Sequence, residues 1–237
     1  MSDLKAYVIE TNSATLSASL SELFPPGALA AELRKPGDLE ALLPDERQYH
    51  RGAVPKRAQE FAAGRMCAHR LLAEFGIVDF PVKVAADRQP LWPDALVGSI
   101  THTTGFCAAV VASRKSLSAI GIDSEIAGSV KRELWRSICT PSETAWLRSL
   151  PQAEQAAAAT LIFSAKEAFY KCQYPLLGER LGFHDANVEP AWGFGRGSFT
   201  IHVNSTALPR HASLPLEGRY LFHEQFVTTG IALPGPR

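Results

Sequence analysis

The sequence has little of what defines several common protein classes. Cysteine is scarce, with four residues among 237, and no C-x-x-C pair occurs, which disfavours both a disulfide framework and a structural zinc site. We expect reduced, mostly buried thiols at Cys67, Cys107, Cys139 and Cys172. Net charge is also lacking, because 24 Lys and Arg balance 24 Asp and Glu. No global field therefore attracts nucleic acid or an anionic membrane.

Long hydrophobic runs and internal repeats are missing as well. The first ten residues carry Asp3, Lys5 and Glu10 and leave no apolar stretch for a signal peptide or a membrane span, so we expect a cytoplasmic protein with no membrane partner. The absence of a fixed-period repeat excludes a solenoid. What is present is a globular composition, 46% hydrophobic and 20% charged, which excludes a disordered or coiled-coil chain.

Strand and helix signals cluster separately along the chain, which predicts an α+β fold rather than a doubly wound one. The first fifty residues predict two short helices. Strands are predicted at residues 6–9, 97–101, 106–112, 117–123, 198–203 and within 220–233, with 113–116 as a hairpin connection. Helices are predicted at residues 55–75, 129–138, 141–150 and 152–173. Thr140, Pro141 and Glu143 form a capping-box pattern at the start of the third helix.

Two acids share one face of the strand-like run at residues 119–125. Successive side chains of a strand point to opposite faces, so Asp123 and Glu125 project together while Ile120 and Ile122 anchor the other side. Two such carboxylates repel unless a positive charge lies between them, and a hard divalent cation such as magnesium meets that need. The alternative is the wet face of a strand that ends in solvent.

A second charged pair lies late in the long Ala-rich helix. Glu167 and Lys171 are i,i+4 neighbours, and an exposed helical pair is one interpretation. They are, however, surrounded by Phe163, Phe169 and Tyr170, an apolar setting that indicates a cleft rather than a solvated stripe.

A third segment, residues 98–105, brackets His102 with glycines and small hydroxyl residues. Backbone N–H groups and hydroxyls in such a turn can bind a phosphate, with the histidine as a further donor. The alternative is a polar surface turn. The segment lacks the G-x-x-x-x-G-K-[ST] pattern, which disfavours P-loop nucleotide hydrolysis.

Taken in this order, the three segments resemble the signature blocks of the 4′-phosphopantetheinyl transferases. The closest likeness is to the two-subdomain surfactin-synthetase-activating type and to enterobactin synthase component D. The resemblance extends upstream to residues 56–65 and 88–93 and covers roughly residues 55–185. One departure is Phe163, where many members of the family have tryptophan.

The resemblance implies transfer of the phosphopantetheine arm of coenzyme A to a serine of an acyl or peptidyl carrier protein, with release of 3′,5′-ADP. It also implies two similar α+β subdomains, a pseudo-dimer divided here into residues 1–114 and 115–237. Coenzyme A is expected in the cleft between the subdomains of a monomer. Magnesium is the expected metal, and manganese also suits oxygen ligands.

The resemblance assigns roles to individual residues. The expected metal ligands are Asp123, Glu125 and Glu167. Glu167 is also the candidate to remove the serine hydroxyl proton, directly or through a metal-bound water, and Lys171 is an expected phosphate contact. Residues expected to contact coenzyme A are Arg57, Arg65, Arg88, Gln89, Thr101, His102, Asp123, Lys166, Glu167, Lys171 and Leu181. Leu181 is placed beside the pantetheine arm, and a packed loop leucine is the alternative.

A basic segment follows the metal strand and could steer an acidic carrier protein through Lys131, Arg132 and Arg136. A solvated basic face is the alternative. Two other functions stay open, a non-catalytic coenzyme A or carrier-binding module and a metal-dependent phosphoesterase. The sequence does not distinguish carriers of fatty-acid, polyketide, nonribosomal-peptide or siderophore synthesis.

Overall fold

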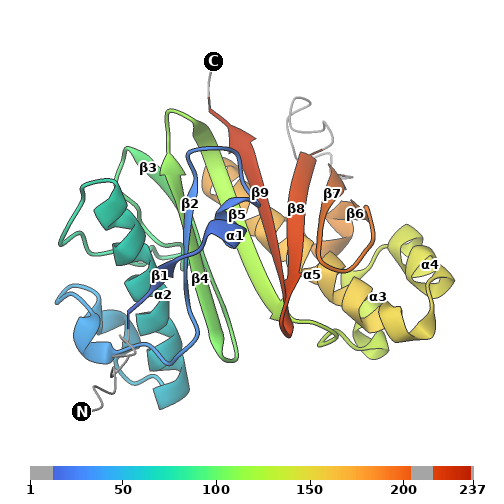
Figure 1. The fold of residues 1–237 in the computed structure, drawn as a ribbon, viewed down its shortest axis with the longest axis horizontal. Coiled ribbons are helices and arrows are strands. Elements are labelled where there is room, and N and C mark those ends of the chain that lie inside the picture. The colour runs from blue at the N-terminus through green and yellow to red at the C-terminus, as the bar shows by residue number, and fades with distance from the viewer. Residues whose placement is uncertain (1–12, 204–215, 236–237) are drawn as a thin grey trace, which may run out of the picture.

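The strands form two separate antiparallel sheets in the computed structural model, which describes residues 13–203 and 216–235 (Figure 1). The first sheet has the strand order β1-β2-β4-β3. Its strands are β1 (Thr15–Leu16), β2 (Leu29–Leu33), β3 (Leu96–Thr103) and β4 (Phe106–Ser113). The strand predicted at residues 6–9 lies outside the described residues.

The second sheet has the strand order β5-β9-β8-β7-β6. Its strands are β5 (Leu117–Ile126), β6 (Ala186–Pro190), β7 (Arg196–Val203), β8 (Leu216–His223) and β9 (Phe226–Pro234). β5 therefore lies at one edge of this sheet and pairs with the strand that comes last along the chain. The sequence pattern did not predict β2 or β6.

One long helix accompanies each sheet. The helices are α1 (Ala18–Ser21), α2 (Pro55–Glu74), α3 (Trp135–Ile138), α4 (Pro141–Ser149) and α5 (Gln152–Leu177), with 3₁₀ turns η1 (Leu39–Ala41), η2 (Arg47–His50), η3 (Arg132–Leu134) and η4 (Phe183–Asp185). The long helices are α2 in the first half and α5 in the second, which confirms an α+β fold built from two halves of related design. Within the described ranges, none of the helices has the length and apolarity needed to traverse a bilayer.

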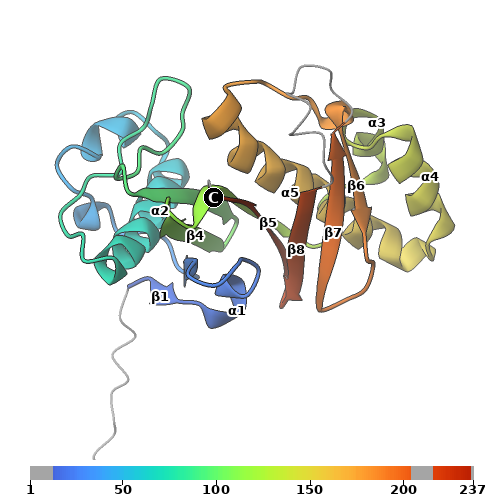
Figure 2. The same ribbon diagram turned by 90° about the horizontal axis from the view of Figure 1, so that it is seen from above.

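Both faces of the first sheet are buried, as β4 illustrates. Cys107, Ala109 and Val111 pack in the cluster with α2, whereas Ala108 and Val110 pack in the cluster with α1. The α1 cluster also receives Ile120 and Ile122 of β5 and so joins the two sheets. Figure 2 shows α5 and α1 on opposite faces of this double sheet. The face of β5 that carries Asp123 and Glu125 is thereby turned towards α5.

The segment at residues 113–116 is not a hairpin, contrary to the sequence prediction. β4 already pairs with β2 on one side and with β3 on the other, so β5 cannot join it. The chain instead crosses to the second sheet, where β5 pairs with β9. The subdomain division at residues 114 and 115 stays a prediction, and this change of sheet falls at the same place.

The helix predictions are confirmed in part. The capping box is present, because Thr140 Oγ1 accepts a bond from the Glu143 backbone N–H and Glu143 Oε2 accepts one from the Thr140 N–H at 2.7 Å. The helix predicted at 129–138 is only the turn η3 followed by α3. α5 does not stop before Pro175 but continues to Leu177, where Gly178 ends it in the left-handed conformation.

The contact between α5 and β5 is unusually close at Gly121. A Cβ atom at this position would lie 2.0 Å from the Ala168 carbonyl oxygen and 2.8 Å from the Cys172 backbone nitrogen. Only glycine therefore allows the helix backbone to rest on this strand. The approach sets the residues beside Ala168 and Cys172, namely Glu167 and Lys171, against the strand that carries Asp123.

Candidate active site

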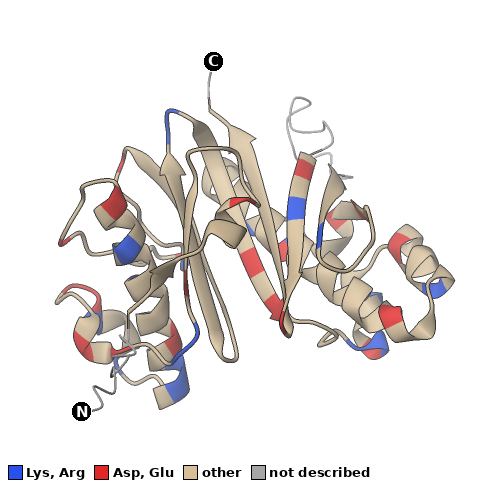
Figure 3. Ribbon diagram, in the orientation of Figure 1, with Lys and Arg blue, Asp and Glu red and all other residues tan. Residues whose placement is uncertain are grey.

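The predicted acids of β5 meet the charged pair of α5 across this close contact. Acidic positions lie along β5 in Figure 3. Asp123 is only 4% exposed, and its Oδ1 accepts a hydrogen bond from Lys171 Nζ at 2.7 Å. Its second oxygen, Oδ2, is buried and has no hydrogen-bond partner. A buried carboxylate oxygen without a protein partner is costly, so Oδ2 is the atom of Asp123 that can accept a further ligand.

The two other acids have raised pKa values, chiefly because they are buried. Burial raises the pKa of Glu125 to about 7, Asp123 and Glu167 push it in the same direction, and Lys171 opposes them. Burial also raises the pKa of Glu167, with Lys171 opposing and Asp123 adding to the shift. A positive charge beside these acids would lower both pKa values, as Lys171 already does in part.

A divalent cation fits the chemistry of this donor set. The carboxylate oxygens are hard ligands, one of them has no partner, and the raised pKa values of two acids show that a positive charge would be favourable here. In the described part of the chain, however, no three Asp, Glu, His or Cys side chains are gathered closely enough to hold an ion as they stand. The residue types therefore suit a divalent cation, but their side chains would have to move closer together to bind one.

A cluster of Arg57, Glu60 and His102 lies on the first half, where α2 meets the end of β3. Arg57 Nη1 contacts His102 Nε2, and Glu60 Oε2 lies 3.4 Å from Arg57 Nη1 and 3.8 Å from His102 Nδ1. Burial lowers the pKa of His102, and Arg57 adds to the shift. The charges of Lys171 and Asp123 also act on this imidazole, so the Arg57 cluster and the acids lie within electrostatic reach. The sequence analysis did not single out Glu60. Its position three residues after Arg57 on a predicted helix is the signal that could have indicated this ion pair.

Arg65 does not join this cluster. Its side chain is 7% exposed, its Nε donates to the Val82 carbonyl at 3.1 Å, and its guanidinium lies 3.8 Å from the centre of the Phe61 ring. Burial lowers its pKa to about 10. The structure thus gives Arg65 a packing role in the first half.

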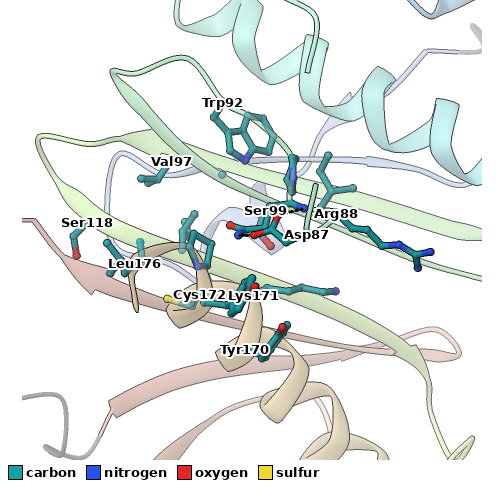
Figure 4. Close-up of a pocket in the computed structure, with 18 of the residues that line it drawn as sticks. Asp87, Arg88, Trp92, Val97, Ser99, Ser118, Tyr170, Lys171, Cys172 and Leu176 are labelled. Carbon is teal, nitrogen blue, oxygen red and sulfur yellow. Dashed lines mark hydrogen bonds between the residues drawn. The ribbon is translucent and has the colours of Figure 1, made fainter. Parts of the chain in front are cut away.

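A cavity of about 320 Å³ opens between the two halves. Its walls come from the loop before β3, from β3 and β5, and from the end of α5 (Figure 4). Arg88 and Gln89 line it, together with Lys171 and with Trp92 and Tyr170, and their contact with coenzyme A stays a prediction. Gln89 Nε2 donates to Asp87 Oδ2 at 2.6 Å, which fixes the loop.

A second cavity, of about 310 Å³, lies on the other side of Tyr170, which lines both. Glu167 and Leu181 line this second cavity. At its border Phe163 packs on Phe183, with ring centroids 5.6 Å apart, so phenylalanine fills the position where the family commonly has tryptophan. Lys171 thus lines the first cavity and Glu167 the second.

Lys166 is placed away from the acids, although phosphate contact was expected of it. Its Nζ donates to Glu143 Oε2 at 2.7 Å, to the Phe183 carbonyl at 2.7 Å and to the Ile138 carbonyl at 2.9 Å. The two charged side chains are 2% and 1% exposed. With all three N–H donors engaged, Lys166 joins α5 to α3, α4 and η4 and has none left for a phosphate.

Carboxylates, the Arg57 cluster and two cavities lie at the junction of the two α+β halves. Acidic and cationic side chains around a cavity are typical of enzymes that move phosphorylated groups. A model of the 4′-phosphopantetheinyl transferase N-terminal domain matches residues 45–112, and a model of the 4′-phosphopantetheinyl transferase superfamily matches residues 119–226.

Curated relatives agree with these models. The chain is 34% identical to 4′-phosphopantetheinyl transferase Svp of Streptomyces mobaraensis over 82% of this chain and 80% of that one. It is 32% identical to 4′-phosphopantetheinyl transferase Npt of Nocardia iowensis over 90% of this chain and 99% of that one. It is also 34% identical to enterobactin synthase component D of Salmonella typhi over 70% and 66% of the two chains.

The chain therefore belongs to the 4′-phosphopantetheinyl transferase superfamily, and the resemblance seen in the sequence is confirmed. It is a transferase that moves the phosphopantetheine group of coenzyme A to carrier proteins.

We predict that Lys166→Met lowers the free energy of unfolding by about 3–5 kcal/mol, because it leaves Glu143 as an unpaired buried charge. Urea unfolding followed by circular dichroism measures this. The exposed Lys131→Met is the control and should stay within about 0.5 kcal/mol of the wild type. Equal stabilities of the two variants would contradict the role of the buried pair.

The raised pKa of Glu125 predicts a pH dependence of stability. Between its ordinary value of 4.5 and about 7, the folded protein holds a proton that the unfolded chain has lost, so the free energy of unfolding falls as pH rises through this window. In urea titrations without divalent cations, the free energy of unfolding of Glu125→Gln should fall less steeply with pH than that of the wild type. The exposed Glu133→Gln should keep the wild-type slope, and an unchanged slope in Glu125→Gln would refute the prediction.

Proposed function

We propose that this chain is a magnesium-dependent, cytosolic and monomeric enzyme that transfers phosphopantetheine from coenzyme A to a serine hydroxyl of an acyl or peptidyl carrier protein. The single observation that supports the proposed metal site is the buried, unpartnered Oδ2 of Asp123 beside two acids with raised pKa values. Two halves in one chain form the interdomain cavity, which supports a monomer. Four buried, unpaired cysteines support a reducing compartment.

Asp123, Glu125 and Glu167 would hold the cation. When bound, magnesium supplies charge neutralisation for the diphosphate of coenzyme A, and manganese has a similar ligand preference. Lys171 lies beside Asp123 and lines the interdomain cavity, so its ammonium is placed to bind a phosphate oxygen. Arg57 and His102 would bind the 3′-phosphate, and Arg88 and Gln89 would contact the adenosine end from the cavity wall.

Glu167 is the group we assign to proton transfer. A raised pKa makes a carboxylate a stronger base, which suits removal of a proton from a serine hydroxyl. The serine oxygen then forms a bond to the β-phosphorus, and the bond from this phosphorus to the oxygen of the departing 3′,5′-ADP breaks. Glu167 keeps the proton, and 3′,5′-ADP leaves with the electron pair. Leu181 lines the cavity beside Glu167, which supports a place for the pantetheine arm there.

The test of this proposal is the mass of an apo-carrier protein incubated with the enzyme, coenzyme A and magnesium. We expect a phosphopantetheine mass gain, with Glu167→Gln lowering the transfer rate by about 100-fold or more because the base is lost. Glu154→Gln on the same helix is the matched control, since a glutamine oxygen can still accept the bond from Trp192 Nε1.

The other functions have their own outcomes in this assay. Tight coenzyme A binding without a mass gain would mark a binding module, and coenzyme A consumption without carrier modification would mark a phosphoesterase. Full turnover of Glu167→Gln would refute the assigned base. Parallel assays with fatty-acid, polyketide, nonribosomal-peptide and siderophore carriers identify the partner.

The exposed basic segment around η3 and α3 is proposed as the surface that steers the carrier. Lys131, Arg132 and Arg136 are exposed there, and Leu134 adds an apolar side chain that is 47% exposed. Arg132→Glu and Arg136→Glu should each raise the KM for an acidic carrier about tenfold while the coenzyme A KM stays unchanged. Arg51→Glu, an equal charge change at an exposed site on the first half, is the control. Unchanged carrier kinetics in all three variants would exclude this surface.

A further inference from the structure

Two hydroxyl groups join the sheets where the edge strands β3 and β5 meet. Ser99 Oγ accepts a hydrogen bond from the Ile122 backbone N–H at 3.2 Å, and Thr101 Oγ1 accepts one from the Ser124 N–H at 3.0 Å. Ser99 and Thr101 are 4% and 2% exposed. The two hydroxyl oxygens thus accept bonds that backbone carbonyls accept inside a sheet. Both acceptors belong to β3 in the first half, and both N–H donors belong to β5 in the second half.

Thr101 makes one contact that Ser99 does not. Its hydroxyl donates to Asp123 Oδ1 at 3.3 Å, the same oxygen that accepts from Lys171 Nζ. A hydroxyl has a single proton, so the Thr101 donor is fully used here. Two donors, one from each half of the molecule, therefore hold Oδ1 and leave Oδ2 without a partner in a buried position.

We infer that Thr101 is a positioning residue that sets the rotation of the Asp123 carboxylate, so that Oδ2 stays turned to the place of the cation. This inference rests on the proposed cation site. Outer donors of this type orient ligating carboxylates, and their removal typically weakens metal binding by about 10–100-fold. The single proton of the Thr101 hydroxyl serves Asp123 in this role, and the expected contact of Thr101 with coenzyme A stays a prediction.

The inference has a structural consequence for the two halves. The orientation of a ligand on β5 depends on a side chain of β3, so the cation site is complete only when the two edge strands are in register. Ser99 contributes to the same register without touching Asp123, which makes it a matched control for the loss of one hydrogen bond between the sheets.

The experiment measures Mn²⁺ affinity of the full chain by electron paramagnetic resonance, with and without coenzyme A, for wild type, Thr101→Val, Thr101→Ser and Ser99→Ala. Urea unfolding of each variant gives the change in the free energy of unfolding that follows from the lost hydrogen bond. We expect Thr101→Val to bind Mn²⁺ about tenfold or more weakly than wild type. Thr101→Ser, which keeps the hydroxyl, should recover most of the affinity, and Ser99→Ala should lose stability but keep its Mn²⁺ affinity within about twofold.

The outcomes separate the inference from the function on which it rests. Equal Mn²⁺ affinities of Thr101→Val and Ser99→Ala, with wild type binding normally, would overturn the inference and leave the enzyme assignment untouched. If the wild type binds no Mn²⁺ both with and without coenzyme A, the proposed cation site itself is overturned. Failure of Thr101→Ser to recover affinity would also overturn the inference, since the hydroxyl is then not the operative group.

Discussion

The close packing of α5 against β5 is the constraint on which the remaining structure depends. The backbone of the helix touches the strand at Gly121, where a side chain would collide with the Ala168 carbonyl. Because of this contact, Lys171 of the helix pairs with Asp123 of the strand. Burial raises the pKa values of Glu125 and Glu167, and the charge of Asp123 adds to both shifts.

The two halves place different chemistry at their junction. The second half has the carboxylates and Lys171, whereas the first half has Arg57 and His102 and the loop that walls the interdomain cavity. The proposed coenzyme A site would use this separation, with the 3′-phosphate at Arg57 and the diphosphate near Lys171. The neutral overall charge of the chain is therefore no obstacle to binding a polyanion, because the fold gathers local charge of each sign.

Much of the fold could be read from periodicity, capping and alternation, since α2, β3, β4 and the capping box at Thr140 depend on neighbouring residues. The crossing of the chain to the second sheet at 113–116 could not be predicted, because the partner of β5 is decided by which strand edges are free after folding. The site acids followed from strand alternation and family motifs. The places of Arg65 and Lys166 did not, since a charged side chain looks the same in sequence whether it meets a phosphate or a buried partner such as Glu143. That distinction requires the tertiary contacts.

The pairing of β5 with β9 has a consequence for the order in which the enzyme matures during synthesis. Asp123 lies opposite Thr229, so the strand that carries the acids leaves the ribosome long before its neighbour exists. The first sheet can close early from β1 to β4, which follow one another within the first half. The acid-bearing strand must wait, with one edge open, until the far end of the second sheet has been translated. The sheet that holds the acid-bearing strand is thus completed only after β9 has been synthesised.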